Sequence, residues 1–397
     1  MSATTALRET PRLRLIRRTR LPRLLFVATV ADTVRGFLLP LAAHFRKQGW
    51  RVDAMAQSIE QDRACEAAFD SVSNAKWSRN PLDPRNLLEA GRIRRAIEQG
   101  GYDLVHVHTP VASFITRYAA EPLRRTGKLK VVYTAHGFHF HPGGSNFRNR
   151  IFETLERRAG RWTDYLVLMN REDVAAAKDK RIMAAERIRS MPGIGIDRSF
   201  YSPEQVRDEA VDAFRSEIGI APDVPLLLML AEFIPRKRHS DAIAAFANVQ
   251  QPGKLVFAGS GPLLDPMKDL ARKLGLSDRI VFLGVRGDVP VLLRAARGLV
   301  LPSEQEGLPR SILEALSMGV PAIGSRIRGT AELLEDGAGL LVDVGDIGGL
   351  SQAMEYLLAS KSAAQAMGRR GQELSERYDL VNILDLHEDL YREALQL

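Results

Sequence analysis

Two glutamates, Glu306 and Glu314, stand eight residues apart in the stretch of this sequence that points most directly to chemistry. An apolar run at 298–301 predicts a short buried strand, and apolar residues after Pro309 predict a helix with the proline in its first turn. The N–H groups and the dipole at a helix N-terminus attract anions. Carboxylates beside such a site suit a ligand with phosphate and hydroxyl groups, such as a nucleotide sugar. Spacing alone, however, favours two ordinary surface glutamates.

Cations and glycines follow two further predicted strands. The run Arg236-Lys237-Arg238 comes soon after a predicted strand at 226–230, where its charges can neutralise a diphosphate, although alone it is an ordinary solvated loop. Gly259 and Gly261 form a turn between a predicted strand at 254–258 and a helix, where the backbone can approach a ligand closely. Each feature is weak when taken singly.

Histidines form a third cluster. His136 follows a predicted strand at 131–135, and His139 and His141 alternate after it. Histidines two residues apart in an extended loop can share a face, so a metal site is conceivable. No carboxylate is spaced with them and the chain has no Asp-x-Asp motif, so we predict neither a metal nor a cofactor. The two histidines of the strand at 103–108 share one face and are predicted to pack or to orient this loop.

The composition is that of a globular protein with two domains. At 397 residues, of which 45% are hydrophobic and 26% charged, the chain has enough apolar material for two cores. The single cysteine, Cys65, permits no intrachain disulfide and favours a cytoplasmic setting. No apolar run approaches the ~20 residues that span a bilayer. Residues 1–31 resemble a signal peptide, but a first strand explains them better because further elements follow at once.

A net charge of +8 predicts an anionic partner. No zinc finger or aromatic-rich RNA-binding motif occurs in the sequence, so we predict that this partner is not a nucleic acid. Basic residues near the start, at 85–95 and at 148–161 suit an anionic membrane surface, although scattered solvated arginines explain them equally well.

The elements that position these residues alternate between strand and helix. Predicted strands lie at 24–30, 50–56, 103–108, 131–135, 165–169, 226–230, 254–258, 279–283 and 299–301. Predicted helices lie at 37–48, 87–99, 147–161, 240–247, 263–274, 288–295, from 309 and at 384–395, with a loop at 31–36. This alternation predicts an α/β protein with two parallel sheets that bind ligands at the carboxyl ends of their strands. Breakers at 191–203 predict the interdomain linker.

The segment from Leu301 to Val342 resembles the donor-binding core of family 4 of the retaining glycosyltransferases, which have the GT-B fold. Members of that family carry two glutamates separated by seven residues, as Glu306 and Glu314 are here. The strings Thr134–Phe140 and Arg328–Leu333 resemble the subgroup that makes capsular polysaccharide and exopolysaccharide. The resemblance covers residues 24–380 in order and implies two Rossmann-like domains that face each other across a cleft.

The resemblance also implies roles for particular residues. Glu314 would hold the ribose hydroxyls of the nucleotide, whereas Glu306 would address the sugar with the N–H groups that follow it. His136 would reach the sugar near its reacting carbon, and Lys237 would neutralise the diphosphate. We therefore predict His136, Lys237 and Glu306 as catalytic residues. The predicted donor-binding residues are Arg236, Gly259, Gly261, Gly307, Leu308, Arg310 and Glu314.

One position departs from the family pattern. Glu232 stands where most members have an arginine, although the polysaccharide subgroup also has a glutamate there. Arg236 or Arg238 is then expected to supply the missing positive charge.

The resemblance implies a domain organisation and a reaction. We expect a basic tail at 1–23, an acceptor-binding domain at 24–196, a nucleotide-sugar-binding domain at 197–379 and a helix at 380–397 that returns to the first domain. The expected reaction transfers a hexose or N-acetylhexosamine from a UDP-sugar to a polyprenyl-diphosphate-linked glycan. It would serve bacterial exopolysaccharide, capsule or O-antigen synthesis at the inner face of the plasma membrane, with the protein bound peripherally.

Two alternatives remain open from the sequence. The first is a UDP-sugar epimerase on the same fold, which would release a free sugar without an acceptor. The second is a basic, non-catalytic module that binds a membrane or a nucleic acid.

Overall fold

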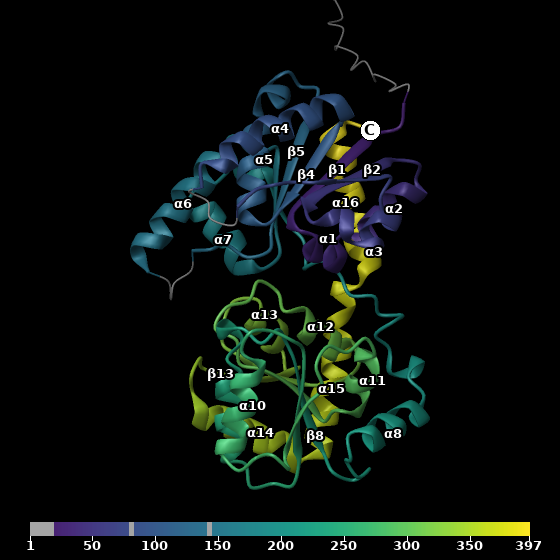
Figure 1. Cartoon of the computed structure of the whole chain (residues 1–397), viewed down its shortest axis with the longest axis vertical. Coiled ribbons are helices and arrows are strands. Elements are labelled where there is room, and N and C mark those ends of the chain that lie inside the picture. Colours follow the sequence, from purple (N-terminus) through teal and green to yellow (C-terminus); the bar gives the residue numbers. More distant parts are fainter. Residues whose placement is uncertain (1–19, 79–82, 141–144) are drawn as a thin grey trace, which may run out of the picture.

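The computed structural model describes residues 20–78, 83–140 and 145–397, and these form two α/β domains (Figure 1). The first nineteen residues of the expected basic tail, and His141, lie outside the described residues. Each domain is built on one parallel sheet. The α/β class and the two Rossmann-like sheets predicted from the sequence are therefore confirmed.

The first domain contains a seven-stranded sheet in the order β3-β2-β1-β4-β5-β6-β7. Its strands are β1 (Arg23–Val30), β2 (Arg51–Gln57), β3 (Ser71–Asn74), β4 (Leu104–His108), β5 (Lys130–Ala135), β6 (Tyr165–Leu168) and β7 (Ile188–Ser190). Its helices are α1 (Ala31–Phe37), α2 (Leu39–Lys47), α3 (Arg63–Ala68), α4 (Arg85–Gly100), α5 (Pro110–Arg125), α6 (Asn146–Gly160) and α7 (Arg171–Asp179). Two hydrophobic clusters cover the opposite faces of this sheet, as parallel strands require.

The second domain contains a six-stranded sheet in the order β10-β9-β8-β11-β12-β13 over a single large hydrophobic cluster. Its strands are β8 (Leu226–Leu230), β9 (Lys254–Ala258), β10 (Ile280–Phe282), β11 (Gly298–Leu301), β12 (Ala322–Ser325) and β13 (Gly339–Val342). Its helices are α8 (Asp208–Glu217), α9 (His239–Ala247), α10 (Leu264–Lys273), α11 (Val289–Ala295), α12 (Arg310–Ser317), α13 (Thr330–Leu334), α14 (Ile347–Ala359) and α15 (Lys361–Ser375). Short 3₁₀ turns lie at Ile59–Gln61, Ala185–Arg187, Pro203–Gln205, Pro235–Lys237 and Glu376–Tyr378.

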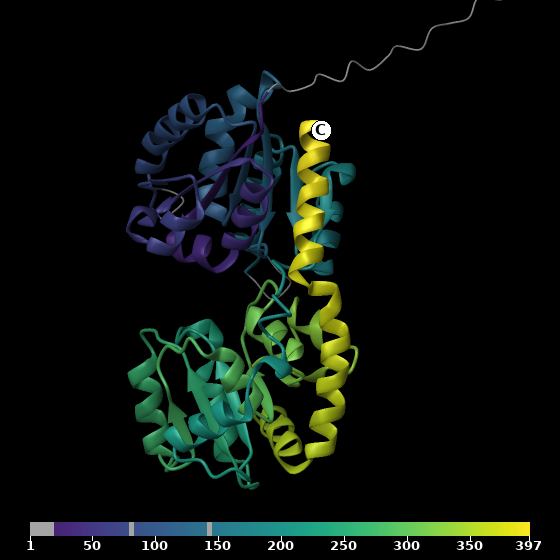
Figure 2. The ribbon, with the colours of Figure 1, turned by 90° about the vertical axis from the view of Figure 1, so that its right-hand side faces the viewer.

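The last helix, α16 (Leu380–Leu395), packs on the first domain although it follows the second in sequence (Figure 2). Leu390, Tyr391 and Leu395 join the hydrophobic cluster of the first sheet. At the edge of the contact, the His44 ring Nε2 lies 3.0 Å from an oxygen of Glu388. The chain thus passes twice between the domains. Helix α16 covers one face of the first domain's sheet.

Two local predictions were wrong. Residues 31–36 form helix α1 instead of a loop, because Ala31 and Val34 lie one helical turn apart and are both buried. Pro309 lies just before α12 rather than in its first turn: its φ of −71° and ψ of 113° are extended, and the helix begins at Arg310. The described residues contain no helix that is long and apolar enough to cross a membrane.

Candidate active site

The carboxyl ends of both sheets face each other, with α1, α3 and α7 at the edge of the first domain and α12 and α13 at the edge of the second (Figure 1). The loop after β5 begins with His136, and the loop after β11 contains Glu306 and Gly307. These two loops touch, because a Cβ atom on Gly307 would lie 1.6 Å from the carbonyl oxygen of His136. The structure therefore brings His136 and Gly307 together from different domains.

Three glycines make this approach possible. A Cβ on Gly137 would lie 3.1 Å from the Cα of Gly307, and a Cβ on Gly329 would lie 1.9 Å from the carbonyl oxygen of Gly307. Both Gly137 and Gly329 also have positive φ angles, which disfavour other residues. A side chain at Gly137 or Gly307 would push the two domains apart, whereas one at Gly329 would displace the Gly307 loop within the second domain.

A buried ion pair lies beside the glycines and also joins the domains. The Arg328 guanidinium, only 5% exposed, donates to Asp173 Oδ1 at 2.7 Å. It also donates to the carbonyl oxygen of Phe138. Asp173 accepts from the side-chain amide of Asn170 at 2.8 Å. The sequence showed Arg328 only as part of a subgroup string, and its partner 155 residues earlier could not be identified from any local pattern.

Glu306 lies between two of the predicted cations. Its side chain is 9% exposed, and one carboxylate oxygen accepts from the ammonium of Lys237. The other oxygen is 3.8 Å from the guanidinium of Arg236, which is 44% exposed. Arg238 instead pairs with Asp241 at 2.6 Å. Of the two arginines considered as substitutes for the one replaced by Glu232, Arg236 is therefore the one that faces Glu306.

Glu314 lies on α12 and is buried. Its Oε1 accepts from the Tyr201 hydroxyl at 2.7 Å and from Arg310 Nε at 2.8 Å. Burial raises the pKa of Glu314, whereas Arg310 and Tyr201 oppose this shift. Its Oε2 makes no hydrogen bond with any part of the chain that the structure describes. Arg310 also donates to the carbonyl oxygen of Gly36 in the first domain at 2.7 Å.

Tyr201 is a site residue that the sequence did not reveal. It lies in the segment predicted to be the linker, 113 residues before Glu314, and its ring is almost fully buried. A tyrosine surrounded by breakers carries no helical or strand pattern, so no feature of the sequence marks it as a partner of a glutamate.

The glycine turn after β9 packs against the loop after β8. A Cβ on Gly259 would lie 2.0 Å from the carbonyl oxygen of Ala231, and one on Gly261 would lie 2.6 Å from that of Phe233. Both glycines therefore serve a close contact between two loops of the second domain. The loop they support leads directly to Arg236 and Lys237, and so to the predicted diphosphate site.

His136 is half-buried, and other rings hold it in place. Its Nε2 lies 3.1 Å from His108 Nδ1, and the Phe37 ring stacks on it at 5.2 Å. Burial lowers the pKa of His136 to about 4, so the ring is neutral near pH 7. The His106 and His108 rings lie 4.2 Å apart, and His106 Nδ1 is hydrogen-bonded to the Tyr391 hydroxyl of α16. A line of buried rings thus connects the last helix to His136.

The predicted site residues therefore form two groups. His136, Glu306, Gly307, Lys237 and Arg236 lie together between the domains. Arg310 and Glu314 lie on the first turns of α12, and Leu308 packs on Gly193 of the segment between the domains. Within the described residues, no group of three His, Cys, Asp or Glu side chains is arranged to hold a metal ion.

Comparison with known proteins gives family matches in both domains. Residues 37–197 match the family described as Glycosyltransferase Family 4, and residues 211–374 match Glycosyl transferases group 1. The chain is 31% identical over 373 residues to the putative glycosyltransferase EpsD of Bacillus subtilis (strain 168), which covers 93% of this chain and 96% of that protein.

Two further comparisons concern a more distant relative and the fold. The chain is 26% identical over 306 residues to the UDP-Gal:alpha-D-GlcNAc-diphosphoundecaprenol alpha-1,3-galactosyltransferase of Escherichia coli, covering 75% of this chain and 77% of that one. The structure of Anabaena HepE in complex with UDP-glucose superposes with a TM-score of 0.78 at 20% identity, over 94% of this chain and 99% of that one. At this level of identity, the superposition shows that the two proteins share a fold.

Proposed function

Because the chain belongs to glycosyltransferase family 4 and has the GT-B fold, we propose that it transfers a hexose or an N-acetylhexosamine from a UDP-sugar to a lipid-linked glycan, with retention of the anomeric configuration. The observation that carries the proposal is the contact of His136 with Gly307 between the domains, with Glu306 and Lys237 beside it. Groups suited to a sugar and to a diphosphate meet there at the carboxyl ends of two parallel sheets.

Several observations support a uridine nucleotide donor. The E. coli relative takes UDP-Gal by its name, and HepE has been crystallised with UDP and with UDP-glucose. In this chain Glu314 Oε2 has no partner among the described residues, so it is available to accept from ribose hydroxyls. Its other oxygen is held by Tyr201 and Arg310, which fixes the carboxylate before the ligand binds.

The reaction in this proposal depends on charge stabilisation. Departure of the nucleoside diphosphate leaves negative charge on phosphate oxygens and positive charge on the sugar ring. Lys237 and Arg236 stabilise the diphosphate, and Glu306 holds Lys237 and orients the sugar. The acceptor hydroxyl attacks from the face that the diphosphate leaves and gives its proton to a departing phosphate oxygen, so the configuration is retained. Neutral His136 contacts the sugar near the reacting carbon.

The acceptor and the location of the enzyme are also proposals. The name of the E. coli relative specifies a diphosphoundecaprenol-linked sugar as the acceptor. We place the acceptor on the first domain and the protein on the cytoplasmic face of the membrane as a peripheral enzyme. The basic helices α4 and α6 would then contact anionic lipids.

Thermal unfolding with UDP, GDP, ADP and dTDP tests the donor. A ligand at 100 times its Kd adds about 2.7 kcal/mol of stability, which raises the unfolding midpoint by several degrees. We expect UDP to raise the midpoint and Glu314→Gln to abolish the rise, since the amide keeps the shape of the side chain but cannot accept at both positions. If no nucleotide raises the midpoint, the proposal fails. Free sugar formed from UDP-sugar without an acceptor would instead indicate an epimerase.

A further inference from the structure

A large pocket in the first domain lies outside the donor site. It has a volume of about 880 Å³, within the range of ~300–1,000 Å³ for small-molecule sites. Its wall includes Val30, Gln57 and Asn74, the last residues of β1, β2 and β3. The pocket therefore opens at the carboxyl ends of the strands, where parallel sheets bind their ligands.

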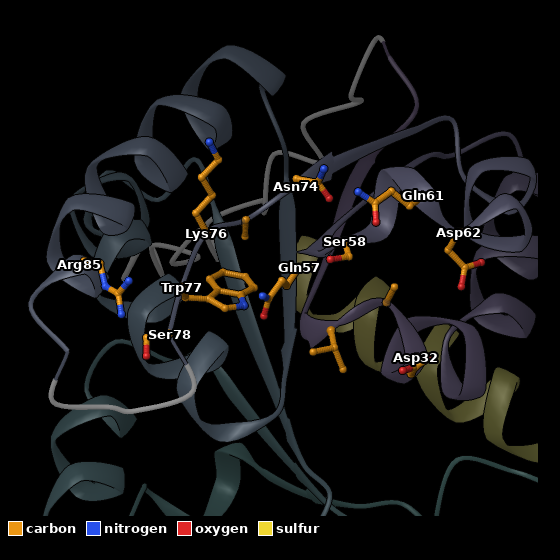
Figure 3. A pocket seen from close by; sticks show the side chains of 13 residues that line it. Asp32, Gln57, Ser58, Gln61, Asp62, Asn74, Lys76, Trp77, Ser78 and Arg85 are labelled. Atoms are coloured by element: carbon orange, nitrogen blue, oxygen red, sulfur yellow. The ribbon is translucent and has the colours of Figure 1, made fainter. Parts of the chain in front are cut away.

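Several polar side chains in this pocket have no partner among the residues that the structure describes. Figure 3 shows Gln57 beside Trp77 in the middle of the pocket, with Ser58 and Gln61 on one side and Arg85 on the other. The side chains of Gln57, Ser58, Gln61 and Lys76 make no hydrogen bond or ion pair within the described part of the chain. Amide and hydroxyl groups that both donate and accept are the groups that recognise sugar hydroxyls.

The walls that carry these groups are fixed. The Trp77 indole is 3% exposed and donates to the carbonyl oxygen of Thr29 at 2.8 Å. The side-chain amide of Asn74 donates to Glu60 at 2.6 Å. Ser58 has a φ of 59°, a strained value for a residue other than glycine, and such strain is concentrated at binding sites. The pocket thus combines a rigid frame with unused hydrogen-bonding groups.

The charges around the pocket cancel. Lys76 and Arg85 are balanced by Asp32 and Asp62, so the lining has no net formal charge. Arg35, which lies outside the lining, pairs with Asp62 at 2.6 Å and also with Asp32. A diphosphate needs a cluster of unpaired cations, and among the described lining residues only Lys76 has no carboxylate partner, since Arg85 pairs with Asp83. A neutral, hydroxyl-rich ligand therefore suits the pocket better than an anion.

Helix α1 connects the pocket to the donor site. Ala31 and Asp32 line the pocket, whereas Phe37 at the other end of the helix stacks on His136. Five residues of helix span about 8 Å. The carbonyl oxygen of Gly36 accepts from Arg310 of α12. Helix α1 therefore contacts the pocket at its first residues and the His136 ring at its last.

We propose that this pocket binds an uncharged saccharide portion of the acceptor, so that the acceptor is recognised by its sugar hydroxyls and its diphosphate lies elsewhere. This inference rests on the proposed function, because it assigns the acceptor of the same reaction. Gln57, Ser58 and Gln61 hydrogen-bond the sugar, and Trp77 forms the fixed wall beside it.

Saturation-transfer NMR with methyl glycosides of glucose, galactose, mannose and N-acetylglucosamine tests the proposal. At least one glycoside should bind the wild type. The double variant Gln57→Leu/Gln61→Leu should weaken that binding by about fivefold or more, because two hydrogen bonds are lost. Ser58→Gly should weaken it without loss of stability, since glycine adopts this φ readily. Gln99→Leu, an exposed glutamine at the end of α4, is the matched control and should bind normally.

Three results would overturn the proposal. The first is that no glycoside binds the wild type, and the second is that the double variant binds as tightly as the control. The third is displacement of the glycoside by inorganic pyrophosphate in the wild type but not in Lys76→Met, which would indicate an anion site. UDP-dependent thermal shifts, measured on the same variants, report the donor site separately. A retained UDP shift with no glycoside binding would therefore remove this inference and leave the proposed function intact.

Discussion

The contact between the domains and the pocket of the first domain differ in how their polar groups are used. At the contact, Arg328 and Asp173 are buried and fully paired, and Gly307 touches the backbone of His136. In the pocket, Gln57 and Gln61 are exposed and have no partner among the described residues. Paired groups hold the two domains in register, whereas unpaired groups remain available for a ligand. Substitutions at the contact should therefore affect stability and rate, and those in the pocket only binding.

The largest expected effect is on stability at the contact. Arg328→Met should lower the free energy of unfolding by about 3–5 kcal/mol, because it leaves the buried Asp173 carboxylate uncompensated. Urea unfolding measures the change. The matched control is Arg326→Met, whose partner Asp343 is 79% exposed, and its cost should be below about 1 kcal/mol. Equal losses in the two variants would contradict the assignment of Arg328 as a structural link.

The buried histidines should make stability depend on pH. Burial lowers the pKa of His387, on α16, to about 4, below the value of about 6.5 in the unfolded chain. As the pH falls, the unfolded state takes up a proton before the folded state does. The contribution of His387 to the free energy of unfolding is therefore complete above about pH 6.5 and is lost as the pH falls toward 4. Between pH 7 and pH 4, His387→Leu should lose about 3 kcal/mol less stability than the wild type. A parallel loss in both proteins would refute this.

The glycine contact should control rate more than stability. Gly307→Ala places a Cβ against the His136 carbonyl oxygen, so the loops must separate. A displacement of about 1 Å at reacting groups lowers rates by about 100-fold, and we expect this for sugar transfer. Gly287→Ala is the control, because a Cβ there meets nothing within 4 Å. If Gly307→Ala retains wild-type kcat, the contact does not position His136.

Replacing His108 should lower the rate of sugar transfer, but by less than Gly307→Ala does, because His108 acts through its hydrogen bond to His136. Replacing it with leucine removes the only ring hydrogen bond recorded for His136 among the described residues, while Phe37 still stacks on it. Loss of one such bond corresponds to about 1 kcal/mol, or roughly a fivefold lower kcat. The KM for the UDP-sugar should not change, since His108 is itself buried. Steady-state kinetics separate the two constants, and a raised KM with normal kcat would argue against orientation.

The smallest effect on folding should come from the pocket. Lys76→Met and Gln57→Leu remove side chains that have no partner in the described residues, so each should change the unfolding free energy by less than about 0.5 kcal/mol. Larger losses in urea unfolding would show that these groups serve the fold. The pocket would then no longer differ from the contact between the domains, because the polar groups of both would stabilise the fold.

Much of the fold was predictable from local patterns. Strands such as β8 and β9 are short apolar runs, and helices such as α4 and α6 show a clear helical period, so their types and approximate ends followed from the sequence. Helix α1 was missed because it begins directly at the end of β1 and contains a glycine, Gly36. Only its packing on the sheet shows that Ala31 and Val34 share a buried face.

The sequence by itself determined the family, the parallel α/β class and the glutamates, histidine and lysine of the candidate site. Each of these depends on a few neighbouring residues whose spacing is fixed by a strand, a turn or a helix. The tertiary structure decided which groups meet: Tyr201 with Glu314, Asp173 with Arg328, and the ends of three strands around one pocket. These partners lie far apart in the chain, and the folding of two separate sheets brings them together.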